Sequence, residues 1–85
     1  MITAKIIKIK LFKSRYGGDC YLVCFKSDKD KSYNSYIYPK MRNWVRWKKV
    51  LKVGIILSGL KLKDKTLINA DSKFKVEKEF RNETT

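Results

Sequence analysis

The sequence predicts a mainly β protein, a small five-stranded barrel with one short helix between its third and fourth strands. Three observations lead to this fold class. Residues 5–38 hold three strand-like segments separated by polar or glycine-containing turns. The apolar spacing then becomes helical over residues 40–52, and strand-like runs return from residue 55. Because 85 residues enclose one small core, we expect one domain over residues 1–80 and a frayed tail over residues 81–85.

Residues 5–13 (KIIKIKLFK) are expected to form the first strand, because apolar residues alternate with lysines along it. The side chains expected to face the core are those of Ile7, Ile9 and Leu11. The side chains expected on the outward face are those of Lys8, Lys10 and Phe12. Residues 14–19 (SRYGGD) should form the turn that follows, since glycine tolerates positive φ.

Residues 20–26 (CYLVCFK) are expected to form the second strand, with two alternating faces. Because cysteine is small and usually buried, we expect Cys20, Leu22 and Cys24 to face the core. The side chains expected to point outward are then those of Tyr21, Val23 and Phe25, and the opposite assignment is the alternative. Along a strand the two cysteine Cα atoms would lie about 13 Å apart, too far for a disulfide.

Residues 33–38 (YNSYIY) have high β propensity and complete an antiparallel meander of three strands. Tyr36 and Tyr38 are expected on one face of this third strand. Pro39 ends the strand pattern and suits the first turn of a helix over residues 40–52. Gly54 is a plausible stop for that helix.

The predicted helix carries an apolar stripe beside a basic stripe. The apolar stripe consists of Met41, Trp44, Val45, Trp47, Val50 and Leu51. The basic stripe consists of Arg42, Arg46, Lys49 and Lys52. We expect Trp44 to fill one end of the barrel. Trp47 lies at the edge of the apolar stripe, so its position allows either core packing or contact with a partner.

Residues 55–63 and 66–70 are expected to form the fourth and fifth strands, the fifth resuming through Phe74 and Val76. Three meandering strands, a helix and two further strands follow one another in the order of the OB-fold, a small five-stranded barrel. The SH3-like barrel is the main alternative, but it lacks a three-turn helix at this place. The sequence therefore predicts an OB-fold-like barrel.

The last two predicted strands carry a resemblance to a known family. Gly54-Ile55-Ile56-Leu57, followed by Leu67-Ile68-Asn69-Ala70-Asp71-Ser72, resembles the fourth and fifth strands of small OB-fold single-stranded-DNA-binding proteins. Proteins of this type are associated with phages and mobile elements of low-GC bacteria. The resemblance covers roughly residues 4–77 and depends on element order more than on one motif. It implies a single-stranded-DNA-binding protein in the replication or recombination of such an element.

The charge of the chain favours a polyanionic partner. The formal net charge is +13 and the pI is about 9.9. Residues 1–63 contain 16 Lys and Arg against 3 acidic residues, whereas residues 64–85 contain 5 against 5.

Without histidine and with one pair of cysteines, neither a zinc finger nor a Ser/His or Cys/His catalytic pair can be assembled. We therefore expect no enzyme activity, no metal and no cofactor.

Membrane association is not expected. No apolar run approaches the roughly 18 residues of a membrane span, and Lys5, Lys8 and Lys10 interrupt any signal-peptide core. The amphipathic helix is also short, and its apolar stripe is needed by the barrel. We expect a cytoplasmic protein.

A protein binds single strands without catalysis by combining a cationic groove with aromatic faces that stack on bases. In an OB-fold this surface centres on the second and third strands and on the loops beside them. The residues that these positions imply are Lys8, Lys10, Phe12, Arg15, Tyr16, Tyr21, Phe25, Tyr36, Tyr38, Lys63 and Lys65. The expected ligand is single-stranded DNA, with RNA as an alternative.

The predicted helix supports a second class of function. Trp and Arg dominate interface hot spots, so the helix is a candidate contact surface for a protein or for nucleic acid. The residues concerned are Arg42, Arg46, Trp47 and Lys49. The chain would then be an accessory subunit that docks on a DNA polymerase, primase or helicase. Binding of duplex DNA or of RNA is a third possibility, and the sequence leaves the oligomeric state open.

Overall fold

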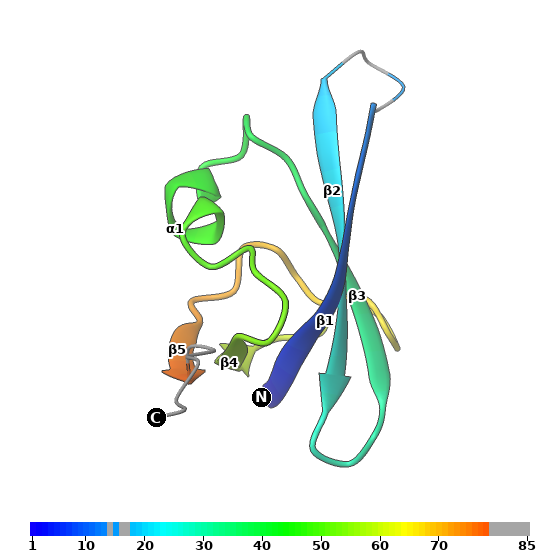
Figure 1. Cartoon of the computed structure of the whole chain (residues 1–85), viewed down its shortest axis with the longest axis vertical. Helices are drawn as coiled ribbons and strands as arrows, with labels where there is room; N and C mark the ends of the chain where they lie inside the picture. The colour runs from blue at the N-terminus through cyan, green and yellow to red at the C-terminus, as the bar shows by residue number, and fades with distance from the viewer. Residues whose placement is uncertain (14, 16–17, 79–85) are drawn as a thin grey trace.

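The computed structural model describes residues 1–13, 15 and 18–78, and these residues form a mainly β structure with one short helix. The elements in chain order are β1 (Ile2–Lys13), β2 (Asp19–Ser27), β3 (Ser32–Ile37), α1 (Trp44–Lys48), β4 (Ile56–Leu60) and β5 (Lys75–Lys78) (Figure 1). The predicted helix between the third and fourth strands is therefore confirmed. The predicted tail over residues 81–85 lies outside the described residues.

The five strands form one antiparallel sheet in the order β3-β2-β1-β4-β5. The meander expected for the first three strands is confirmed. The long strand β1 joins the two halves of the sheet, because β2 pairs with one edge of it and β4 pairs with the other. The sheet is not closed into a barrel. The predicted mainly β class is thus confirmed, whereas the predicted closure is not.

The segment predicted as the fifth strand, residues 66–70, forms only isolated bridges. Leu67 makes a parallel bridge to Asn34 of β3, and Ile68 makes an antiparallel bridge to Leu62. The Asn34 N–H donates to the Thr66 carbonyl at 2.8 Å, and the Ile68 N–H donates to the Asn34 carbonyl at 2.7 Å. This segment therefore ties the edge strand β3 to the residues that follow β4. The strand β5 forms later, near the predicted continuation through Val76.

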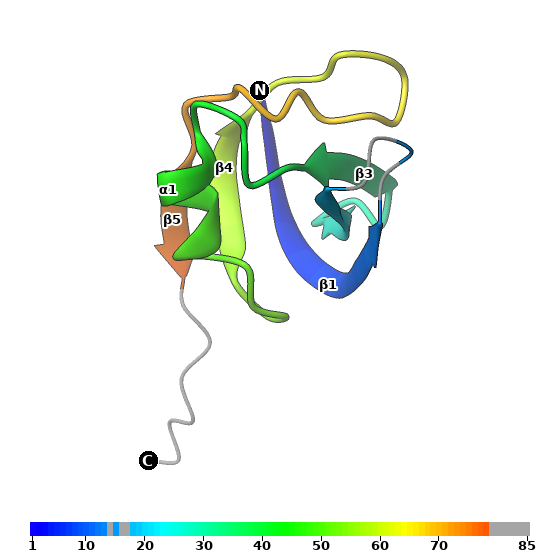
Figure 2. The ribbon, with the colours of Figure 1, turned by 90° about the horizontal axis from the view of Figure 1, so that it is seen from above.

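A register shift in β1 changes which of its side chains face the core. Before the shift Ile6 is fully buried, and after it Ile9 lies opposite the buried Val23. Ile7 is the extra residue of this β-bulge and is 42% exposed, so its predicted place in the core is wrong. Leu11 shares the inner face with Ile9 but is 60% exposed. Bulges bend strands, and β1 curves strongly in Figure 2.

The strand β2 presents to the core the face that was predicted to be outward. Val23 and Phe25 are fully buried, and Tyr21 packs against the core cluster. The predicted outward orientation of Tyr21 and Phe25 is therefore wrong. An aromatic ring buries far more apolar surface than a thiol, so Phe25 determines the orientation of the strand. Cys20 is nevertheless fully buried on the opposite face.

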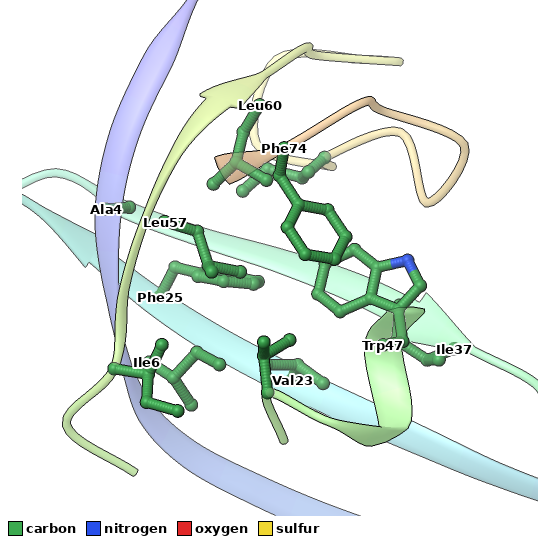
Figure 3. Packing of buried hydrophobic residues seen from close by; sticks show 12 residues of the cluster. Ala4, Ile6, Val23, Phe25, Ile37, Trp47, Leu57, Leu60 and Phe74 are labelled. Carbon is green, nitrogen blue, oxygen red and sulfur yellow. The ribbon is translucent and has the colours of Figure 1, made fainter. Parts of the chain in front are cut away.

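Trp47, rather than Trp44, is the tryptophan that fills the core. It is fully buried, its ring lies 4.5 Å from that of Phe74 and 6.4 Å from that of Phe25, and its indole N–H donates to the Ala70 carbonyl at 2.8 Å (Figure 3). Trp44 is only partly buried. The helix is much shorter than residues 40–52, so it directs one large side chain inward instead of a continuous stripe.

Candidate nucleic-acid interface

The outer face of β1, β2 and β3, turned away from the core, brings together four of the predicted binding residues, Lys8, Lys10, Phe12 and Tyr36. Strand register places the side chains of this face in rows across the three strands. These rows are Lys8–Cys24–Asn34, Lys10–Leu22–Tyr36 and Phe12–Cys20. Tyr38 follows directly after β3. The face therefore has one strand with lysines, a central strand of apolar and thiol side chains, and one strand with amide and aromatic groups.

The separation of the cations from the aromatic ring follows from the spacing of the strands. Neighbouring strands lie about 4.8 Å apart, so the lysines of β1 and the tyrosine of β3 are separated by about 10 Å. Along each strand, residues of one face repeat about every 6.6 Å. The outer face thus offers cations along one side and an aromatic ring along the other, with the shorter side chains of β2 between them.

The aromatic side chains of the outer face are partly exposed and hold one another in place. Phe12 and Tyr36 are 42% and 43% exposed, and their rings meet edge to face with centroids 6.4 Å apart. Tyr38 is also 42% exposed, and its backbone N–H lies 3.3 Å from the sulfur of Met41. Half-exposed rings in fixed positions can stack on bases with little loss of side-chain entropy.

Among the residues that the structure describes, no carboxylate pairs with the lysines of the outer face. Between residues that the structure describes, two ion pairs are present, Lys13 with Asp19 at 3.0 Å and Lys26 with Asp30 at 3.5 Å. Lys8 and Lys10 belong to neither, and both are exposed. Their charge is therefore available to a polyanion.

Three further predicted residues lie in loops beside the sheet. Arg15 is exposed in the turn between β1 and β2, and Tyr16 lies outside the described residues. Lys63 and Lys65 are exposed in the loop that follows β4. The backbone of this loop is held by the Lys63 N–H, which donates to the Leu67 carbonyl at 2.7 Å. Because Thr66 accepts from Asn34, the loop lies next to β3.

Four predicted contact residues are placed elsewhere or are already engaged. Phe25 and Trp47 belong to the core and present no surface. Tyr21 lies on the inner face, where it stacks on Trp44. Arg46 donates from Nη2 to the Phe74 carbonyl at 2.8 Å, and its guanidinium carbon lies 5.1 Å from the centre of the Phe74 ring.

Arg42 and Lys49, the other two residues of the predicted helical surface, lie just outside α1 and are exposed. With Trp47 buried, however, the predicted surface of Trp47 and its flanking cations is not assembled on α1. A protein partner of the kind first expected would therefore lack its aromatic anchor at this position.

Sequence reasoning missed Leu22, Cys24 and Asn34 as residues of the outer face. Leu22 and Cys24 follow from strict alternation once Phe25 is assigned to the core, since β2 then shows its even-numbered residues outward, and Asn34 follows from alternation with Tyr36 in β3. The size of Phe25 was the signal that pointed to this assignment. Asn34 is exposed while both its backbone N–H and its carbonyl are hydrogen-bonded to residues 66–68, so its position is well fixed.

Comparisons with models of known protein families, with curated proteins and with solved structures find no match. In the described part of the chain, no group of three or more His, Cys, Asp or Glu side chains is arranged to hold a metal ion. None of the described helices combines the length and the apolar character needed to cross a membrane.

Proposed function

We propose that this protein binds single-stranded nucleic acid, with DNA as the principal ligand, on the outer face of β1, β2 and β3. The observation that carries the proposal is the presence on one face of the exposed Lys8 and Lys10, which form no ion pair with a described residue, together with the half-exposed rings of Phe12 and Tyr36. Cations that follow phosphates and rings that stack on bases are the two components of single-strand recognition.

The arrangement of these groups suggests how a strand would lie. Phosphates would run along the lysines of β1, and bases would extend over Leu22 and Cys24 toward Tyr36. Each base stack contributes about 1 to 3 kcal/mol. In a duplex the base faces are occupied by neighbouring base pairs, so the aromatic part of this surface would have nothing to bind. The proposal therefore includes a preference for single strands over duplex.

We also propose that the fold is related to the OB-fold. An OB-fold has a fifth strand between its third and fourth, and residues 66–69 bridge β3 and the residues after β4 here. We interpret the protein as an open variant of that barrel, with this segment in the place of the fifth strand. A role in the replication or recombination of a phage or mobile element depends on the resemblance described above.

A titration tests the proposal directly. A labelled oligo(dT), the corresponding RNA and a matched duplex would be titrated with the protein at two salt concentrations, with fluorescence anisotropy as the signal. We expect the single strand to bind at least about tenfold more tightly than the duplex, since stacking adds to the shared phosphate contacts. Equal affinity for the duplex would contradict the proposal. Tighter binding of RNA would leave the outer face as the proposed binding surface but make RNA, and not DNA, the principal ligand.

A further inference from the structure

A second exposed apolar surface lies on the inner side of the hairpin formed by β1 and β2, where the hairpin extends past α1 (Figure 1). We call it the inner ledge and define it as Leu11, Tyr21 and Trp44. Leu11 and Tyr21 are opposite each other in the register, and Leu11 is 60% exposed. Tyr21 stacks on Trp44 with ring centroids 5.5 Å apart and an interplanar angle of 23°.

The inner ledge lies where the core ends. The next row toward the centre of the sheet contains Ile9 and the fully buried Val23, whereas Leu11 has no element packed over most of its surface. On the helix, Val45 follows Trp44 and is 56% exposed. An exposed aliphatic side chain opposite one member of a half-buried aromatic pair forms a small contiguous apolar patch, and contiguous patches mark interaction surfaces.

The stretch of the chain that includes α1 is strongly basic, whereas the row of the hairpin beyond Leu11 and Tyr21 holds the Lys13–Asp19 ion pair. No acidic residue occurs between Asp30 and Asp64. The cations of that stretch are Lys31, Lys40, Arg42, Arg46, Lys48, Lys49, Lys52, Lys61 and Lys63. Of these, Lys48 lies four residues after Trp44 in α1, and it is exposed. Residues at this spacing are neighbours on a helix surface, so a cation lies beside the ledge.

We propose that the inner ledge binds an acidic peptide segment of a partner protein, with apolar side chains that contact Leu11 and Trp44. Acidic residues in the segment complement the cations of α1, and they give both specificity and a fast association. The proposal does not depend on the nucleic-acid function, because the ledge is on the opposite face of the hairpin from Phe12 and Tyr36.

The composition of the ledge favours a peptide over a nucleic acid. Leu11 is aliphatic and has no face on which a base can stack. Tyr21 and Trp44 are stacked on each other, so one face of each ring is already covered. Base recognition needs free aromatic faces, whereas a peptide needs apolar area flanked by complementary charge.

The test uses a fluorescein-labelled synthetic peptide that combines Asp and Glu with Phe and Leu, and anisotropy as the signal. Two control peptides replace either the acidic residues by Lys or the apolar residues by Ser. Quenching of tryptophan fluorescence by acrylamide gives a second signal. It reports on Trp44, because Trp44 is partly exposed whereas Trp47 is fully buried. The variants are Leu11→Ser and, as a matched control, Val53→Ser, because Val53 is a similarly exposed aliphatic residue outside the ledge, at 57%.

We expect the acidic apolar peptide to bind and to protect Trp44, and both control peptides to bind at least about tenfold more weakly. Leu11→Ser should lower the affinity about tenfold, and Val53→Ser should leave it unchanged. Three results would overturn the proposal: no binding of the acidic peptide, equal loss in both variants, or Leu11→Ser weakening oligo(dT) binding instead. A concentration-dependent dimer that Leu11→Ser dissociates would overturn it as well, since a second copy would then occupy the ledge.

Discussion

Phe12 of β1 and Tyr36 of β3 contact each other across β2, with ring planes at 86° and ring centroids 6.4 Å apart. The strand between them places Leu22 opposite Tyr36 and Cys20 opposite Phe12. Each ring thereby restricts the other while both stay more than two-fifths exposed. This contact makes the aromatic part of the outer face a fixed surface, so the cost of ordering it on binding is small.

Replacing Tyr36 by Ala tests the stacking part of the interface. We expect Tyr36→Ala to weaken oligo(dT) binding by about 1 to 3 kcal/mol while leaving the slope of log K against log salt unchanged, because a base stack releases no counterion. Tyr36→Phe keeps the ring and should bind nearly as the parent does. Salt titrations of the three proteins measure both quantities. A changed slope in Tyr36→Ala would show that the ring acts through the phosphates.

Replacing Lys10 by Ala tests the cationic part of the interface. One phosphate contact fewer should reduce the magnitude of the salt slope for a single strand by about 0.7 and weaken binding to all sequences alike. Lys75 of β5 is exposed on a strand that is not part of the outer face, and Lys75→Ala is the matched control. If both variants changed the slope equally, the charge would act diffusely and the outer face would have no special role.

The two tryptophans should differ in their effect on stability. Trp47→Ala leaves a cavity between Phe25 and Phe74 and should lower the free energy of unfolding by about 3 to 5 kcal/mol. Trp44→Ala removes a half-exposed ring and its stack on Tyr21, and should cost about 1 to 2 kcal/mol. Urea unfolding of both variants provides the comparison. A larger loss for Trp44→Ala than for Trp47→Ala would mean that Trp44, and not Trp47, fills the core.

Gly59 is required where β4 passes close to residues 73–74. Its φ is +77°, and a Cβ atom there would lie 3.0 Å from the Lys73 carbonyl oxygen. Gly59→Ala should therefore cost about 1 to 3 kcal/mol of stability, from strain and from the close contact together. Ser58→Ala, at the preceding residue, should cost less than about 1 kcal/mol. Thermal unfolding can compare them, and a neutral Gly59→Ala would show that the backbone here adjusts freely.

The sequence predicted the outer face better than it predicted the core. Lys8, Lys10 and Phe12 alternate with apolar residues, and alternation is a local property that survives as long as the strand forms. Tyr36 lies in a segment of high β propensity, and alternation places its side chain on the same face as that of Tyr38. Four exposed members of the candidate site therefore followed from patterns of a few residues each.

The errors came from properties that depend on the whole structure. The bulge at Ile7 changes the face of β1, and no local pattern distinguishes it from a regular strand. In β2 the burial preference of cysteine favoured the even-numbered face as the core face, whereas the size of Phe25 favoured the odd-numbered face. The structure packs the odd-numbered face, with Phe25, against the core. Residues 66–69 form isolated bridges to Asn34 and Leu62, two partners from separate parts of the chain that no local pattern indicates. Asn43, Arg46 and Trp47 likewise donate to carbonyls of residues 70–74, and the local pattern of residues 40–52 does not contain these partners.

The central claim is that a single strand lies on the outer face of β1, β2 and β3. Two leucines in neighbouring rows of the hairpin report on its two faces, since Leu22 is opposite Tyr36 on the outer face and Leu11 is opposite Tyr21 on the inner ledge. The most direct measurement is a methyl NMR titration of the protein with oligo(dT). The account predicts that the Leu22 methyl resonances shift and saturate with binding while those of Leu11 stay unchanged. Shifts at Leu11 with none at Leu22 would contradict it.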